Sequence, residues 1–254
     1  MNALVIAAIA LILLSRDGRL DFYLARLAFD LPSGTFPLRD VPLLAVYGHA
    51  WLKNLTTLAW LLCMPIALAS VWLRHLHGWR TALFKFILYA GMAAWAIQSL
   101  KAASPHACPW DLAEFGGSAS WFPLLDNVSL SADGGHCWPG GHASAGFALV
   151  AGWFAARDTH PRIAAIMLWL GLAMGSLMGT IQMLRGAHFL THNLWSLWIV
   201  WAVCLGMEML WQLSTYALQA FRKRSQAASE TPALPQWIPA PESHCDAGSV
   251  QSAQ

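Results

Sequence analysis

The chain has 254 residues, of which 57% are hydrophobic and only 11% are charged, less than half the charged share of an ordinary soluble domain. A soluble fold of this length could not bury so much apolar surface, so the composition favours the lipid bilayer as solvent. Fifteen tryptophans agree with this, because tryptophan favours membrane interfaces. The net charge of +2 gives no reason to expect a nucleic-acid partner.

The N-terminal part predicts a helix followed by a loop. Residues 3–14 are apolar, but crossing a bilayer takes about 20 residues, so we expect a tilted or incomplete first helix. Residues 15–52 are mixed in polarity and are interrupted by Pro32, Gly34 and Pro37, which predicts an interfacial loop.

The rest of the chain predicts a helical core and a tail. The apolar segments are residues 55–73, 82–100, 142–156, 163–184 and 189–213. We therefore predict an all-α fold, a polytopic membrane helical bundle of about six transmembrane helices. Its expected parts are an N-terminal helix and interfacial loop (1–52), a transmembrane core (53–216) and a disordered cytoplasmic tail (217–254).

Basic residues indicate the orientation. They recur in alternate connections, at Arg74 and Arg80, at Arg157 and Arg162, and at 222–224. The positive-inside rule makes that side cytoplasmic, although the arginines between 16 and 39 oppose it. Loop 102–141 and turn 185–192 then face the outside of a bacterial-type inner membrane.

Three short segments converge on that outer face, and together they suit a phosphate group. Lys101 closes one span, Pro-Gly-Gly-His (139–142) opens the next, and Arg185, His188 and His192 lie between the last two. Glycines before a helix let backbone N–H groups approach an anion, and lysine and arginine bind phosphate oxygens. His142 and His188 would supply an acid and a nucleophile. We find no strong metal-ligand pattern and expect no cofactor, so histidine would do the covalent work.

These segments resemble the three motifs of the type 2 phosphatidic-acid phosphatase family, relatives of the vanadium haloperoxidases. The first motif, Lys-x6-Arg-Pro, is matched by Lys101 and Cys108-Pro109, with cysteine in place of arginine. The second, Pro-Ser-Gly-His, is matched by residues 139–142, with glycine in place of serine.

The third motif of the family, Ser-Arg-x5-His-x3-Asp, is matched with three departures. His188 takes the position of the nucleophile, and His192 stands where the family has its aspartate. Gln182 occupies the position of the arginine, while Arg185 lies three residues later. The resemblance covers roughly residues 50–215.

The resemblance implies a six-helix membrane core and a metal-free hydrolysis in two steps. His188 would form a phosphohistidine, and His142 would protonate the leaving oxygen and later help to activate water. Lys101, Arg185 and the amides of Gly140 and Gly141 would hold the phosphate oxygens. His192 would orient His188, unless a loop carboxylate did so; the candidates are Asp111, Glu114 and Asp126. The expected partners are membrane lipids and a lipid phosphate substrate.

Cys108 lies in the first motif and Cys137 two residues before the second, both on the oxidising side of the membrane, so we expect a disulfide between them. In the chain-entropy model, closing a loop of about 30 residues stabilises the fold by roughly 3–4 kcal/mol. The bond would join the two phosphate-binding segments where the usual arginine is missing.

Several functions remain open at this point. The enzyme could be a phosphatase or a phosphotransferase, and the sequence does not choose among phosphatidic acid, phosphatidylglycerophosphate, isoprenyl diphosphate and lipid A. A haem-binding electron carrier would use membrane histidines such as His75, His142, His188 and His192. A transporter or non-catalytic lipid-binding relative would make use of Glu208, a mid-span carboxyl that the phosphatase hypothesis does not need.

Overall fold

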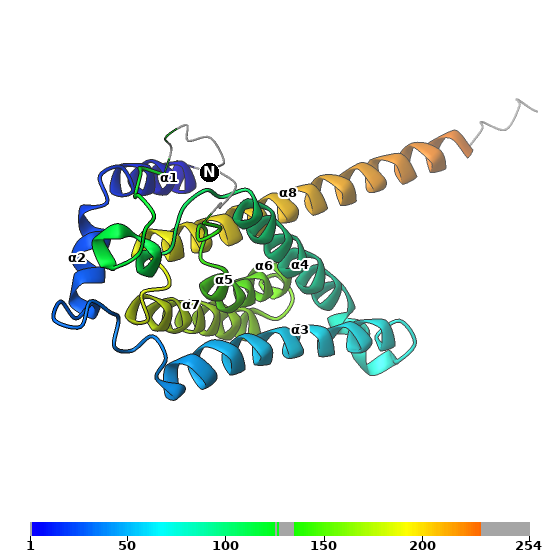
Figure 1. Cartoon of the computed structure of the whole chain (residues 1–254). Helices are drawn as coiled ribbons and strands as arrows, with labels where there is room; N and C mark the ends of the chain where they lie inside the picture. Colours follow the sequence, from blue (N-terminus) through cyan, green and yellow to red (C-terminus); the bar gives the residue numbers. More distant parts are fainter. Residues whose placement is uncertain (1, 125, 127–134, 230–254) are drawn as a thin grey trace, which may run out of the picture. The chain divides into compact units, whose positions relative to one another are not determined.

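The protein is described here by a computed structural model that covers residues 2–124, 126 and 135–229. All long elements in that part of the chain are helices, which confirms the all-α prediction (Figure 1). The α-helices are α1 (Asn2–Leu14), α2 (Arg19–Ala28), α3 (Leu52–Ala69), α4 (Arg80–Ala102), α5 (Gly141–Phe147), α6 (Ala151–Ala156), α7 (Pro161–Leu184) and α8 (Leu190–Ser229). The other elements are a π-helix, η1 (Leu43–Trp51), and four 3-10 turns, η2 (Arg74–Trp79), η3 (Pro109–Asp111), η4 (Ala113–Phe115) and η5 (Ala148–Val150).

Four helical stretches among the described residues are long and apolar enough to cross a membrane: Leu43–Ala69, Arg74–Ala102, Pro161–Leu184 and Leu190–Gln226. The expected count of six is not confirmed. Helix α1 has 13 residues and a length of about 20 Å, and the α5–η5–α6 stretch reaches about 24 Å, whereas the hydrocarbon core is about 30 Å thick.

The structure differs from the sequence prediction at both ends of the core. The expected loop 15–52 contains helix α2, and η1 extends α3 upstream so that this span begins at Leu43. Helix α8 continues to Ser229, so residues 217–229 are helical where we expected the beginning of a disordered tail. The remainder of that predicted tail, residues 230–254, lies outside the described residues.

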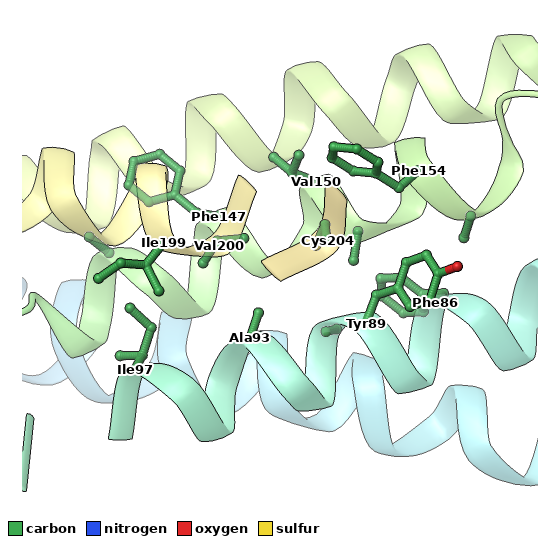
Figure 2. Packing of buried hydrophobic residues seen from close by; sticks show 14 of the residues in the cluster. Phe86, Tyr89, Ala93, Ile97, Phe147, Val150, Phe154, Ile199, Val200 and Cys204 are labelled. Atoms are coloured by element: carbon green, nitrogen blue, oxygen red, sulfur yellow. The ribbon is translucent and has the colours of Figure 1, made fainter. Parts of the chain in front are cut away.

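The hydrophobic core of the unit formed by residues 1–211 lies between α4, the α5–α6 stretch and α8. Figure 2 shows the side chains that meet there: Phe86, Tyr89, Ala93 and Ile97 from α4, Phe147, Val150 and Phe154 from α5–α6, and Ile199, Val200 and Cys204 from α8. These residues recur at helical spacing, so each helix presents one continuous stripe to the core.

Helix α7 packs very closely against α5 and η5 because its glycines remove side chains from the interface. A Cβ added to Gly146 would lie 2.4 Å from the backbone nitrogen of Gly175, and one added to Gly171 would lie 2.8 Å from that of Val150. Small residues four positions apart allow this approach in membrane helices. The close packing fixes the α5–α6 stretch, and with it the helix start that carries His142.

The connections group at the two ends of the bundle as the charge pattern predicted. The rings of Trp79 and His160 stack with centroids 3.5 Å apart, so the connections before α4 and before α7 lie together. At the other end, the backbone N–H of Trp110 donates to the carbonyl of Gly186 at 2.9 Å, which joins loop 102–141 to the turn before α8. The predicted outer segments therefore share one end of the bundle.

An aromatic layer attaches α2 to that end. Its buried members are Phe36, Phe115 and Phe189, with Phe22 and Phe29 of the α2 region packed against them. The ring of Phe36 lies so close to Gly186, which has a φ of +72°, that an added Cβ would be 2.4 Å from it. The N-terminal segment is thus packed onto the candidate site.

Candidate active site

His188 and His192 form a buried pair at the start of α8. His188 lies in the turn before the helix and His192 in its first turn; each is 6% exposed, and the ring centroids are 5.8 Å apart. The backbone of Cys137 lies beside both imidazoles, and Nδ1 of His188 lies 3.3 Å from its Sγ. With Nδ1 directed at Cys137, Nε2 is the nitrogen of His188 that is left to react.

Cys137 is held in place by the disulfide that we expected. Its sulfur bonds to that of Cys108, and the bond spans 29 positions of sequence between the first and second motifs. A disulfide sulfur carries no proton, so its 3.0 Å approach to the carbonyl of Ala187 is a contact and not a hydrogen bond. The disulfide therefore joins the two ends of loop 102–141 and holds Cys137 beside both histidines.

Lys101 and the second motif meet beside this pair. A Cβ added to Gly141 would lie 3.7 Å from Cδ of Lys101, so the lysine side chain passes over the start of α5. The amide of Gly140 donates to the carbonyl of His192 at 3.1 Å, which leaves it committed to the packing of α5 against α8. Gly141 lies beside Lys101, and its amide does not make the bond that occupies the amide of Gly140. Gly141 is therefore the better candidate of the two to bind a phosphate oxygen.

The surroundings of His188 keep it neutral. Burial is the main cause that lowers its pKa well below the usual 6.5, and electrostatic interaction with His192, Lys101 and His142 lowers it further. These three predicted residues thus lie within electrostatic reach of His188. A neutral imidazole has a free lone pair, which is the state that a nucleophile needs.

Among the described residues, the recorded hydrogen bonds of the Arg185 guanidinium go to groups other than the two histidines. Its Nε donates to the carbonyl of Arg39 at 2.8 Å and its Nη1 to Oε1 of Gln182 at 3.1 Å. Burial lowers its pKa, and the nearby carboxylate of Asp40 raises it. These two bonds connect the 36–40 segment to the end of α7, and the predicted role of Arg185 in binding phosphate stays a prediction.

Three buried polar atoms near the pair have no hydrogen-bond partner in the part of the chain that the structure describes: Nε1 of Trp138, Nδ1 of His192 and Oδ1 of Asn193. Trp138 immediately precedes the second motif, His192 ends the third and Asn193 follows it, and a Cβ added to Gly140 would lie 2.5 Å from Oδ1 of Asn193. Unsatisfied buried polar atoms are costly and uncommon, and they concentrate where a ligand completes the bonding.

Asp21 of α2 is the residue that sequence reasoning missed. It is 4% exposed, accepts a hydrogen bond from the backbone N–H of Thr191 at 3.0 Å and another from the Thr191 hydroxyl, and lines a small cavity with His106 and His192. Its signal was present, because Asp21 shares the buried face of an amphipathic helix with Ala25, one turn later. We had assigned that segment to a loop.

The expected loop carboxylates lie elsewhere. Asp111 accepts a hydrogen bond from Nε1 of Trp110, and Asp126 lines a separate cavity with Arg16. For these two and Glu114, the structure records no bond to His188 or His192 among the described residues. His75 is also distant from the pair, since it precedes α4 whereas Lys101 ends it, about 35 Å of helix away.

Cys137, His188 and His192 offer three donor atoms within 4.8 Å of one another. The sulfur, however, belongs to a disulfide and lacks the negative charge of a thiolate, which is the form that binds metal ions. Two imidazoles and a disulfide sulfur are therefore a poor match to a zinc-type ligand set.

The fold and the site define a membrane protein with a helical core and a buried histidine pair beside a lysine and a glycine-rich helix start. The chain belongs to the PAP2 superfamily, whose family model matches residues 82–216, more than half of the chain. Members of this superfamily are generally phosphatases or related enzymes. No curated protein and no solved structure matches the chain. Helices α1, α2 and α3 lie outside the matched segment.

Proposed function

We propose that this protein is a membrane phosphatase that hydrolyses a lipid phosphate monoester or diphosphate through a phosphohistidine. The observation that carries the proposal is the buried, neutral His188 with Lys101 and His142 in electrostatic reach. The site lies at one end of spanning helices, the depth at which a lipid headgroup would present its phosphate. The positive-inside pattern would place this end on the outer face of a bacterial-type inner membrane.

Each residue has a definite part in the reaction. Nε2 of His188 attacks phosphorus in line, and an N–P bond forms as the bond to the leaving oxygen breaks. His142 gives its proton to that oxygen. Water then attacks phosphorus and loses a proton to His142, and the N–P bond breaks to release phosphate. Lys101, with the amide of Gly141, stabilises the negative charge on the phosphoryl oxygens.

The test is phosphate release from a panel of lipid phosphates in detergent, together with acid-quench trapping of the phosphoenzyme from a radiolabelled substrate. We expect wild type to release phosphate and to trap label, with His188→Ala doing neither. Vanadate should inhibit, because its trigonal-bipyramidal adduct resembles the transition state. A wild-type protein that is folded but releases no phosphate from any lipid contradicts the proposal.

Label transfer to an added lipid alcohol instead of water would identify a phosphotransferase with the same phosphohistidine. Activity that persists in His188→Ala would require a different nucleophile. Strong inhibition by a chelator at constant pH would also contradict the mechanism, since no step uses a metal ion.

A further inference from the structure

The start of α8 lacks a cap from its own segment. The first N–H groups of a helix have no intrahelical partner, and a side chain before the helix usually accepts from them. Here the preceding residue is Phe189, which cannot accept, and the first turn of α8 contains no acidic residue. Oδ1 of Asp21 accepts the Thr191 N–H at 3.0 Å, and Oδ2 accepts its hydroxyl. Helix α2 therefore caps α8 across the fold.

This cap is located at the reacting groups. Thr191 immediately precedes His192 and lies three positions after His188, so the turn that carries both histidines is fixed by Asp21. The titratable groups that line the same small cavity as Asp21 are His106, from loop 102–141, and His192, from α8. The positive end of the α8 dipole also stabilises a negative charge at this position.

The local sequence supplies no carboxylate of its own. Between Asp158 and Glu208 the chain has no acidic residue, and His192 occupies the position of the aspartate in the family motif. A phosphohistidine reaction places positive charge on imidazoles when they bond to phosphorus or carry a proton. In a buried site that charge is costly unless a negative group lies near it.

We propose that Asp21 supplies the missing carboxylate: it positions the first turn of α8 through Thr191, and its charge offsets the positive charge on His188 and His192 during turnover. The second half rests on the proposed function. Asp21 touches no reacting atom in this scheme and is a positioning residue. It lies outside the family-matched segment, so the N-terminal helices complete the site.

The charge of Asp21 depends on pH in an accessible range. Burial raises its pKa from 3.8 to about 6, against the opposing effect of the hydrogen bonds from Thr191 and Leu190. Asp21 is therefore a carboxylate above pH 6 and becomes neutral below it. If its charge assists the reaction, kcat falls as the pH drops through about 6.

The test separates the charge of Asp21 from its bonds. Asp21→Asn keeps a cap, because Asn and Asp cap helices about equally well, but it removes the charge; Asp21→Ala removes both. Asp17→Asn is the matched control, since Asp17 is an exposed carboxylate that pairs with Arg19. We expect Asp21→Asn to lower kcat by at least about tenfold, with KM within about threefold, and to abolish the acid limb near pH 6. Wild-type kcat and pH profile in Asp21→Asn would overturn the charge role.

Hydrogen–deuterium exchange of the 186–196 peptide tests the positioning role without any turnover. We expect faster exchange in Asp21→Ala and near wild-type exchange in Asp21→Asn and Asp17→Asn. Unchanged exchange in Asp21→Ala would overturn the positioning role. If Asp21→Ala exchanges faster but wild type hydrolyses no lipid phosphate, the positioning role stands and the proposed function is rejected.

Discussion

The bundle contains a second buried polar cluster, and it differs from the histidine site in how fully its atoms are bonded. Nζ of Lys85 on α4 lies 2.6 Å from Oε2 of Glu208 on α8, and the hydroxyl of Tyr89 donates to the same oxygen at 2.9 Å. The two charged side chains are 7% and 2% exposed. At the histidine site, in contrast, Nδ1 of His192 and Oδ1 of Asn193 lack partners among the described residues.

The difference distinguishes a cluster that joins helices from the candidate active site. The ammonium of Lys85 and the hydroxyl of Tyr89, both on α4, bind the carboxylate of Glu208 on α8. The cluster thus joins two helices and needs no ligand. Glu208 had suggested a transporter, but its bonds to Lys85 and Tyr89 favour helix packing. The histidine site leaves bonding capacity open, which suits a phosphate that comes and goes.

The largest expected effect separates the two clusters by activity. We expect His188→Ala to reduce phosphate release by about a thousandfold or more, because it removes the nucleophile, whereas Glu208→Gln retains most of the activity. Both variants are assayed on the same lipid phosphate, and thermal melting serves as the control for folding. Phosphate release that is lost in Glu208→Gln but kept in His188→Ala would contradict the roles given to both clusters.

The next effect concerns stability at the Lys85–Glu208 pair. Glu208→Ala leaves a buried lysine without its partner, so we expect a loss of about 3–5 kcal/mol in the free energy of unfolding. The double variant Lys85→Met, Glu208→Leu removes both charges and should recover most of that loss. Denaturation in mixed micelles measures both. A double variant as unstable as the single one would mean that the pair does more than join α4 to α8.

The disulfide is expected to contribute somewhat less. Replacing Cys108 and Cys137 by serine opens a loop of 29 positions, which should cost roughly 3–4 kcal/mol in the chain-entropy model. Activity should also fall, because Cys137 lies beside both histidines and its sulfur contacts Nδ1 of His188. Melting of the double variant and non-reducing mass mapping of wild type test this; free thiols at both positions in wild type would refute the bond.

The smallest expected effect concerns the hydroxyl of Tyr89 in the cluster with Lys85 and Glu208. Tyr89→Phe removes one hydrogen bond to Glu208 and leaves the salt bridge, so we expect a loss of about 1 kcal/mol in stability and no change in activity. Trp60→Phe is a suitable comparison, since it removes the hydrogen bond from Nε1 of Trp60 on α3 to the carbonyl of Ile87. Ile87 lies on α4, the helix that also carries Tyr89. A Tyr89→Phe loss several times larger would indicate that the hydroxyl sets the geometry of the pair.

Parts of the site could be predicted because neighbours in sequence remain neighbours in space. The spacing of His188 and His192 places them on adjacent turns, and the Pro-Gly-Gly-His segment had to open a helix. The pairing of Cys108 with Cys137 followed from their place beside the first two motifs. The bond of Arg185 to Arg39 could not be predicted, because the two residues are 146 positions apart; its role at the phosphate stays a prediction.

The sequence by itself determined the membrane class, the helical core and the family motifs, because apolar runs and short-range spacing are local properties of a chain. The tertiary structure alone decided the partner of Glu208, the direction of Arg185 and the arrival of Asp21 at Thr191. Each of these is a contact across 100 residues or more, since Asp21 and Thr191 are 170 positions apart. Composition and periodicity do not specify such contacts; the packing of α2, α4 and α8 does.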